Sequence, residues 1–474
     1  MSPDRSRLYD RPSTPILSFL GGTGTVTGSR FLIETPESAV LIDCGLFQGL
    51  KEFRQRNWAP FPFNPADLDA IIVTHAHIDH IGYLPRLVAQ GFQGEVICSH
   101  GTADLAGIVL PDSGHLQEEE ASFANRMGYS KHHPALPLYT EADALAALTH
   151  IRSAAFAERI AAAPGIEVTL QPAGHILGSA TVTVDVSAAN RSVLFSGDLG
   201  RSSHPILRAP TPPGTTEFLV MESTYGGRAH DDAGAVDQLA DVIRRTAARG
   251  GIVLIPAFAV DRTEVVLFRL RELVSRGAIP DLPVYVDSPM ALRALEVYRS
   301  AIADGASDIR PSVADLSNPF NAGQLHEIRE VEDSKKLAFL KHPAIIVSAS
   351  GMATGGRVLH HLARLLPDFR NSVALVGFQA AGTRGRRLVE GATEVKMLGS
   401  YTTVRAEIAN IRSFSVHADH DELIGWVESA AKAPQRIFLV HGEPEGAEAL
   451  RTSIVSDLGH AAVVPRHLER VLLS

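Results

Sequence analysis

The chain has 474 residues, of which 45% are hydrophobic and 20% charged, with a net charge of −9 at pH 7. This is the composition of a folded protein, and it excludes a largely disordered chain and a surface coated in basic residues, although it leaves room for a local basic groove. The two cysteines, Cys44 and Cys98, exclude a disulfide framework and are typical of the reducing cytoplasm. No stretch approaches the roughly 18 apolar residues of a membrane helix, so no membrane association is expected.

The first two hundred residues combine short strands with one long helical stretch. A polar leader over residues 1–14 is expected to be flexible. The stretch from about 101 to 160 is rich in Ala and Glu and predicts helices that could cover a cleft. Apolar strand patterns lie in a hairpin at 31–45 and at 69–75, 166–171 and 193–198.

After a Pro-rich stretch at 204–217, strands and helices alternate strictly. The strand patterns lie at 217–223, 251–258, 283–289, 344–351, 372–379 and 436–442, and the clearest helical patterns at 237–250, 262–277 and 445–459. Continuous apolar strands that alternate with helices predict an α/β protein whose sheets are largely covered on both faces.

The stretch "THAHIDH" places three histidines and an aspartate within six positions, directly after an apolar strand. His75 and His77 follow the strand end, and Asp79 and His80 lie in the turn before the next helix. Ligands gather at strand ends in α/β sheets, and imidazole with carboxylate suits zinc. A His-rich surface turn is the alternative interpretation, but H-x-H-x-D-H is far more specific than a lone histidine pair.

Three further histidine or aspartate residues also follow strands. They are His175 in "AGHILGSA", Asp198 in "FSGDLG" and His441 in "LVHGEP". Each alone is more often an ordinary loop residue, but together they complete two metal centres. The predicted ligands of two zinc ions are His75, His77 and His175 for the first, Asp79, His80 and His441 for the second, and Asp198 as the bridge between them.

The motifs "LIDCGLFQG", H-x-H-x-D-H, "GHILGSA" and "FSGDLG", in this order, resemble the metallo-β-lactamase fold, which is an αββα sandwich with two zinc ions at one edge. By this resemblance Asp43 orients metal-binding groups and does not itself bind metal. Cys44 beside it is expected to be a small buried residue.

Later motifs resemble the β-CASP branch of that fold, whose members are nucleases acting on RNA or DNA. Glu222 in "LVMESTYGG", His417 in "SFSVHADHDEL" and His441 match three motifs of the branch. The chain as a whole is most similar to bacterial and archaeal homologues of the 3′-end-processing endonuclease subunit of cleavage and polyadenylation specificity factor. This resemblance favours RNA as the substrate.

The resemblance also implies how the chain is divided. It predicts an α/β β-CASP domain at 208–398, inserted between a first part (15–207) and a C-terminal part (399–474) of the metallo-β-lactamase domain. The active site is then expected in the cleft between the domains, where RNA must be single-stranded to enter. The family allows a homodimer.

Two Gly-rich strand-to-helix turns in the inserted domain are predicted to bind phosphate. Free backbone N–H groups at a helix start hold anions, and an arginine adds a bidentate donor. A plain tight connection is the alternative for either turn. The predicted RNA-backbone contacts are Ser348, Ser350, Gly355, Gly356 and Arg357 in "SASGMATGGR", and Thr383 and Arg384 in "GFQAAGTRGRR", beside Arg386 and Arg387.

The resemblance implies that water activated by two zinc ions hydrolyses a phosphodiester. His417 would donate a proton to the leaving oxygen, and Glu222 would orient His417. The other interpretation of His417 is a structural residue before the helix that starts near Asp421. Endonuclease and 5′→3′ exonuclease activities both occur among such homologues, and the motifs do not separate them.

Two other functions share parts of this pattern. A metallo-β-lactamase-fold hydrolase of a small ester, thioester or lactam would keep every zinc ligand but would not need the inserted domain. A catalytically silent RNA-binding scaffold would be expected to have lost ligands, whereas all seven are present here. Cleavage of RNA and the metal content of the purified chain distinguish the three.

Overall fold

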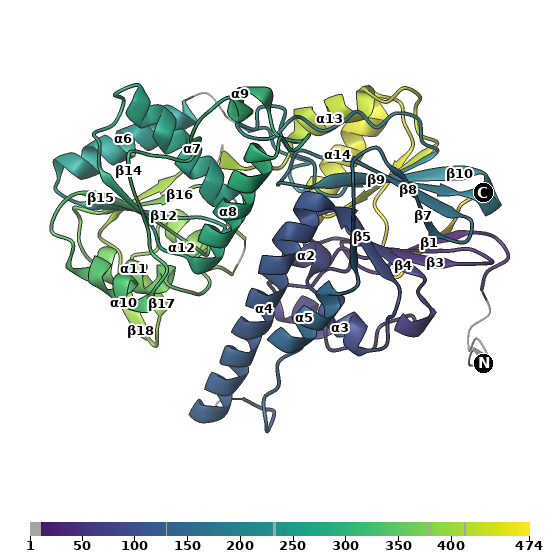
Figure 1. Ribbon diagram of the computed structural model, residues 1–474, viewed down its shortest axis with the longest axis horizontal. Helices are drawn as coiled ribbons and strands as arrows, with labels where there is room; N and C mark the ends of the chain where they lie inside the picture. Colours follow the sequence, from purple (N-terminus) through teal and green to yellow (C-terminus); the bar gives the residue numbers. More distant parts are fainter. Residues whose placement is uncertain (1–10, 129, 231–233, 378, 381, 412–413) are drawn as a thin grey trace. The chain divides into compact units, whose positions relative to one another are not determined.

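Figure 1 shows a computed structural model that describes residues 11–128, 130–230, 234–377, 379–380, 382–411 and 414–474. The chain divides into two compact units: unit 1 is Met1–His204, Arg208–Ala229 and His417–Ser474, and unit 2 is Pro205–Leu207 and His230–Val416. Residues 1–10 of the predicted leader lie outside the described residues. Arg11, the first described residue of this leader, donates to the carboxylate of Asp69 at 3.0 Å.

Unit 1 contains two seven-stranded sheets. In order, the first consists of β22 (Arg470–Leu472), β1 (Ile16–Phe19), β2 (Phe31–Glu34), β3 (Ala39–Ile42), β4 (Ala70–Ile72), β5 (Glu95–Ser99) and β6 (Ile151–Ala154). The second consists of β21 (Ala462–Val463), β20 (Arg436–Val440), β11 (Phe218–Glu222), β10 (Arg191–Phe195), β9 (Ala180–Val186), β8 (Ile166–Pro172) and β7 (Arg159–Ala163).

Apolar side chains from both sheets of unit 1 meet in one core. Alternate residues of a strand point to the same face, so Leu17 and Phe19 of β1 pack with Val182 of β9, Phe195 of β10 and Phe438 of β20. Separate apolar clusters lie on the outer faces, under the helices. The first sheet carries α1 (Lys51–Arg56), α2 (Ile78–Ile81), α3 (Leu84–Ala89), α4 (His100–Met127) and α5 (Glu141–Leu148), and the second carries α13 (His420–Glu428) and α14 (Pro444–Asp457).

This layering confirms the predicted αββα sandwich. The helix ends follow local sequence rules: the Ser99 side chain accepts the N–H of Thr102 at the start of α4, and Gly128 ends the helix with a φ of 65°. The expected helical stretch to residue 160 ends earlier, at Leu148. The residues of β6 that come next pair in parallel with β5 and so extend the first sheet.

Unit 2 is built on a six-stranded parallel sheet. Its order is β14 (Gln324–Glu327), β13 (Pro283–Val286), β15 (Ala344–Ser348), β12 (Ile252–Pro256), β16 (Ser372–Leu375) and β19 (Glu407–Asn410). Its helices are α6 (Ala235–Ala248), α7 (Arg262–Ser275), α8 (Pro289–Ala303), α9 (Pro311–Ala314), α10 (Val331–Lys336), α11 (Val358–Leu365) and α12 (Arg384–Val389). They cover both faces of the sheet, with α6 on one side and α11 and α12 on the other (Figure 1).

The C-terminal part of unit 2 forms a separate ribbon and the last strand of this sheet. The ribbon is a two-stranded antiparallel pair, β17 (Glu394–Met397) and β18 (Ser400–Thr403), and it lies outside the main sheet. The structure pairs β19 with β16, so the chain still belongs to unit 2 after residue 399, where the sequence predicts its return to the first domain. No helix within the described ranges is long and apolar enough to span a membrane.

Candidate metal centre

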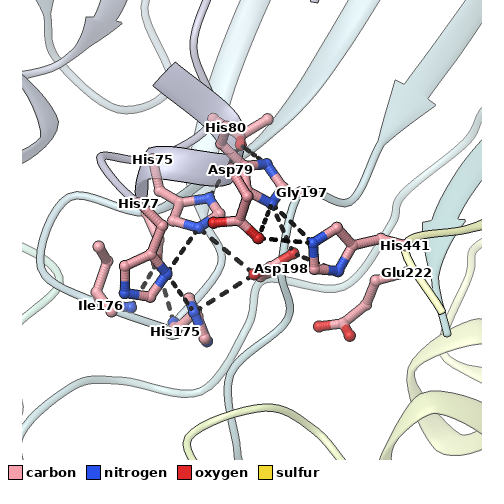
Figure 2. Close-up of polar contacts among 12 residues, drawn as sticks. His75, His77, Asp79, His80, His175, Ile176, Gly197, Asp198, Glu222 and His441 are labelled. Atoms are coloured by element: carbon pink, nitrogen blue, oxygen red, sulfur yellow. Dashed lines mark hydrogen bonds and ion pairs between the residues drawn. The ribbon is translucent and has the colours of Figure 1, made fainter. Parts of the chain in front are cut away.

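Seven histidine and aspartate side chains converge at one edge of unit 1 (Figure 2). Each follows the end of a strand or lies in the short helix after one. His75 and His77 follow β4, Asp79 and His80 lie in α2, and His175, Asp198 and His441 follow β8, β10 and β20, respectively. Strand ends meet at the edge of a sheet, so the fold brings residues together that lie up to 366 positions apart in the chain.

The first group consists of His75, His77, His175 and Asp198. The Nδ1 atom of His77 lies 3.1 Å from Nε2 of His75 and 3.2 Å from Nε2 of His175. Zinc–nitrogen bonds of about 2.0–2.1 Å at tetrahedral angles place ligand atoms about 3.3–3.4 Å apart. Three imidazole nitrogens and a carboxylate therefore already have the spacing that one metal ion requires.

The second group consists of Asp79, His80 and His441. The Nε2 atom of His441 lies 3.2 Å from Nε2 of His80 and 3.2 Å from Oδ2 of Asp79. Two imidazoles and a carboxylate form a second donor set of the same kind, although the Asp79 oxygen is 4.0 Å from Nε2 of His80. These three donors therefore form a second group of the metal-binding type beside the first.

Asp198 lies between the two groups. Its Oδ2 is 3.4 Å from Nε2 of His75, and its Oδ1 is 3.2 Å from Nε2 of His80. The carboxylate is 2% exposed, and Oδ1 lies near imidazole nitrogens of His80 and His441 (3.2 and 3.4 Å) without forming a hydrogen bond of regular geometry among the described residues. A buried carboxylate oxygen without a hydrogen bond is costly unless a cation binds it, so the placement fits a carboxylate that bridges two metal ions.

Burial sets the charge of most imidazoles in this cluster. It lowers the pKa of His75 to about 3 and also lowers the pKa of His77 and of His175, so all three are neutral at pH 7 and free to bind metal. Burial alone would lower the pKa of His80 too, but the carboxylates of Asp198 and Asp43 outweigh it and hold that pKa well above its usual range. The carboxylates of Asp198 and Asp43 thus favour a positive charge at the position of His80.

Asp43 orients two of these histidines through their Nδ1 atoms, directly for His80 and through Thr74 for His75. Its Oδ2 is 2.7 Å from Nδ1 of His80 and accepts the hydroxyl of Thr74 at 3.0 Å, and that hydroxyl is 3.1 Å from Nδ1 of His75. The Nδ1 atoms are thereby engaged and the Nε2 atoms turn toward the metal site. Sequence reasoning overlooked Thr74, although it is the first letter of "THAHIDH".

Thr224 has the same role for His441, and it was also overlooked. Its hydroxyl lies 3.2 Å from Nδ1 of His441 and donates to the carbonyl of that residue at 3.0 Å. Thr224 follows Glu222 in the motif "MESTYGG", so its place in a matched motif was the only available signal. Cys44 is buried as expected, and burial raises the pKa of its thiol to about 12.

His417 and Glu222 lie beside the metal cluster. Nδ1 of His417 is 3.3 Å from Oε1 of Glu222 and 3.9 Å from Oδ2 of Asp198. Glu222 is fully buried, and its carboxylate accepts the N–H of Leu199 at 2.6 Å. His417 is 19% exposed, so it is among the parts of this site that solvent or a substrate can reach.

The two Gly-rich loops of unit 2 hold their arginines internally. Arg357 donates to Oδ1 of Asp287 at 2.7 Å and to the carbonyl of Arg329 at 2.8 Å. Arg384 donates to the carbonyls of Lys396 at 2.8 Å and Thr354 at 3.0 Å. Both guanidinium groups therefore brace the fold, and their predicted contact with phosphate stays a prediction.

The other residues of these loops are arranged in two ways. The Ser348 hydroxyl donates to the carbonyl of Asp287, and Ser350 shares a hydrogen bond of 2.8 Å with Thr354. Thr383 caps α12 by accepting the N–H of Arg386, while Gly355 and Gly356 leave the backbone before α11 with little side-chain cover. Among the predicted phosphate contacts in the described part of these loops, only the Gly355–Gly356 backbone and Ser350 keep the open character that the phosphate hypothesis requires.

Three protein-family models match consecutive parts of the chain. They describe the metallo-beta-lactamase superfamily (residues 23–248), the Beta-Casp domain (263–388) and a Zn-dependent metallo-hydrolase RNA specificity domain (401–465).

Curated proteins match over nearly the whole chain. Ribonuclease TTHA0252 of Thermus thermophilus is 35% identical over 91% of this chain and 94% of its own length. The RNase J-like protein of Methanocaldococcus jannaschii is 32% identical over 90% and 92%, and the transcription termination factor FttA of Pyrococcus abyssi is 33% identical over 96% and 70%. A solved structure of a protein of unknown function from Enterococcus faecalis V583 matches in fold, with a TM-score of 0.53 at 14% identity, over 97% of this chain and 100% of that one.

Proposed function

The chain belongs to the Beta-Casp family of metallo-beta-lactamase-fold ribonucleases, and from this premise we propose that it hydrolyses single-stranded RNA with two zinc ions. The family binds divalent metal, and the relatives named as ribonucleases span almost all of this chain. The choice of zinc, the number of ions and the strandedness of the RNA are our proposals.

One observation carries the proposal: Asp198 belongs to the first ligand group and also lies 3.2 Å from His80 of the second, and His417 lies next to the same carboxylate. In the first group three imidazoles and one carboxylate match the donors that zinc prefers. We assign His75, His77 and His175 to one ion, Asp79, His80 and His441 to the other, and Asp198 to both. When bound, such ions supply Lewis acidity to a phosphoryl oxygen and make a coordinated water more acidic.

The remaining roles belong to the chain's own side chains. We assign to His417 the proton that the leaving oxygen needs, since it faces the shared carboxylate and is partly exposed. Glu222 accepts a hydrogen bond from Nδ1 of His417 and so orients the imidazole beside the carboxylate of Asp198. Asp43 and Thr74 fix the ring orientation of His80 and His75.

Single-stranded RNA fits the burial of the site. His75 and His175 are fully buried, and Asp79 and His417 are each 19% exposed. A flexible single strand can bring one phosphodiester to such groups, whereas a rigid duplex cannot. We expect the hydrolase of a small ester or thioester, the second candidate, to have no use for the inserted unit.

Two further properties remain proposals. Both cysteines are free and buried, which fits a cytoplasmic protein. A homodimer is compatible with the family. Size-exclusion chromatography with light scattering distinguishes monomer from dimer.

The test is cleavage of end-labelled RNA by the zinc-loaded chain. We expect single-stranded RNA with a 5′-monophosphate to be cut and the same sequence in a stable duplex to be cut poorly. Metal analysis should give two zinc ions per chain, and chelation should abolish cleavage. Substrates with 5′-triphosphate, monophosphate or hydroxyl ends distinguish endonuclease from 5′→3′ exonuclease products.

Two outcomes would contradict the proposal. Hydrolysis of a thioester or a lactam without any RNA cleavage would favour the small-substrate hydrolase. Less than one zinc per chain after careful purification, together with RNA binding, would favour a silent scaffold. The matched control is Asp198→Asn, which removes charge from the shared position and should lose both metal and cleavage.

A further inference from the structure

The ribbon of β17 and β18 has one packed face and one exposed face. Val395 and Met397 are buried and belong to the apolar core of unit 2, in contact with residues of α11 and α12. Lys396 and Tyr401 alternate with them and are exposed. One face of the ribbon therefore packs on unit 2 and the other is exposed to solvent, and Figure 1 shows the ribbon beside α10 and α11.

Arginines of α12 fasten this ribbon to the rest of the unit. Arg384 donates to the carbonyl of Lys396 at 2.8 Å and to the carbonyl of Thr354 at 3.0 Å, so it ties the ribbon to the first Gly-rich loop. Arg387 donates to the carbonyl of Glu394 at 3.2 Å. A surface that is held this firmly binds a ligand with little loss of conformational entropy.

Lys396 and Tyr401 face each other across the two strands. They are directly opposite in the register, and Nζ of Lys396 lies 5.9 Å from the centre of the Tyr401 ring. Tyr401 is nevertheless 62% exposed. An exposed aromatic ring next to a cation is the pair that contacts single-stranded nucleic acid, since a base stacks on the ring while the cation meets the phosphate.

The residue at the tip of the ribbon is unusual in its backbone conformation and in its exposure. Leu398 and Gly399 form a two-residue loop with φ values of 48° and 84°, which is the pattern of a type I′ turn. Asn, Asp or Gly is favoured at the first position, but here it is a leucine that is also 52% exposed. A strained and exposed apolar residue at a loop tip points to a function, because folding alone favours neither property.

The local charge also fits a polyanion. Residues 384–405 contain five basic and two acidic residues, whereas the whole chain has a net charge of −9. One of the two acids, Glu390, pairs with Arg386 at 2.6 Å. The ribbon and α12 thus form a positive region on a negatively charged protein.

We propose that the exposed face of this ribbon, with Tyr401, Lys396 and the tip residue Leu398, is an accessory contact for single-stranded RNA. A base stacks on Tyr401, Lys396 meets the adjacent phosphate, and Leu398 offers an apolar edge to a neighbouring base. The inference rests on the proposed function for the identity of the ligand. It adds a binding surface on unit 2 that is distinct from the metal centre of unit 1.

Binding is measured with the zinc-loaded full chain and a single-stranded 2′-O-methyl phosphorothioate oligonucleotide that resists cleavage. Tyr401→Ala should weaken binding about 5- to 100-fold, whereas Tyr401→Phe should bind as the unaltered chain does. Lys396→Ala should reduce the slope of log affinity against log salt by about 0.7. Photocrosslinking with 4-thiouridine RNA should label the peptide that contains Tyr401.

Phe369→Ala is the matched control, because Phe369 is a 67% exposed aromatic residue of the same unit and the arginine after it pairs with Asp368. It should leave affinity unchanged, and all variants should melt within a few degrees of the unaltered chain. Equal affinity of Tyr401→Ala and the unaltered chain would overturn the inference, while RNA cleavage by the unaltered chain would leave the proposed function intact. If the unaltered chain neither bound nor cut RNA, both would fall.

Discussion

Nδ1 of His417 lies 3.3 Å from the buried carboxylate of Glu222, which also accepts the N–H of Leu199, the residue after Asp198. The candidate proton donor and the shared metal-site carboxylate are thus joined through one glutamate. Glu222 thus connects three separate parts of the chain. A substitution of Glu222 should therefore disturb the positions of both His417 and Asp198.

The first prediction concerns His417. His417→Ala should keep its zinc and lose about 10²- to 10⁴-fold in kcat on RNA, because a positioned acid contributes this much to catalysis. The decisive measurement uses RNA with a 3′-sulfur in place of the leaving oxygen. A thiolate leaves without protonation, so the variant and the unaltered chain should cut this substrate at similar rates. An equal defect on both substrates would assign His417 to structure or metal binding instead.

The second prediction concerns Asp43, which contacts no substrate. Asp43→Asn keeps the shape of the side chain but weakens the hold on Nδ1 of His80, which now lies 2.7 Å from the carboxylate. Zinc affinity should fall about 10- to 100-fold, as is usual when a partner of a metal-binding histidine is altered. Competition with a zinc chelator measures this directly. Cleavage should recover when excess zinc is supplied, and a defect that zinc did not relieve would contradict the prediction.

The third prediction concerns the glycine of "LIDCG". A Cβ atom on Gly45 would lie 1.6 Å from the carbonyl oxygen of Asp79 and 2.9 Å from the backbone nitrogen of His80. Gly45→Ala must therefore displace α2. We expect the second group to lose zinc and the free energy of unfolding to fall by about 1–3 kcal/mol.

Gly107→Ala supplies the comparison for Gly45→Ala. Gly107 lies in the middle of α4, where an added Cβ would have no neighbour within 4 Å. This substitution should be neutral or stabilising by about 0.4–1 kcal/mol. Metal analysis and thermal melting of the two variants side by side test the pair, and full zinc content in Gly45→Ala would show that the backbone adapts.

The sequence was sufficient to predict which side chains gather at the metal centre. The seven histidine and aspartate residues follow strands or lie in the turn after one, and strand ends of an α/β fold meet at one edge. The strand patterns alone predict an α/β protein, and the αββα layering was predictable only through the resemblance of the motifs to the metallo-β-lactamase fold. The position of a residue after a strand, and the order of motifs, can both be read directly from the sequence.

Contacts between side chains were not predictable in the same way. Thr74 and Thr224 orient histidines through their hydroxyl groups. A threonine has this role only because of the residues that the fold places next to it, and the sequence does not show those neighbours. Arg384 is predicted to contact phosphate because it begins a helix after glycines, and nothing in the sequence indicates that its guanidinium also braces the ribbon. The partner of a long flexible side chain depends on the whole tertiary fold.

The last prediction concerns a buried acid that the proposed mechanism does not use. Glu264 in α7 is fully buried, and neither carboxylate oxygen has a hydrogen-bond partner among the described residues. Burial, and then the charge of Asp261, hold its pKa well above the ordinary value of 4.5. Between these two pKa values the unfolded chain loses the proton and the folded chain keeps it, so Glu264 favours the unfolded state increasingly as pH rises above about 4.5.

Glu264→Gln removes this penalty and should raise the Tm at pH 7–8, by about 2–4 °C for each kcal/mol gained, with the difference vanishing as pH falls toward 4.5. Glu272→Gln is the control, because Glu272 lies in the same helix, partly exposed and paired with Arg269 at 2.8 Å. It should change the Tm little at any pH. Melting curves of the three proteins at matched pH and zinc concentration measure the effect. A Tm of Glu264→Gln at or below that of the unaltered chain at pH 8 would contradict the prediction.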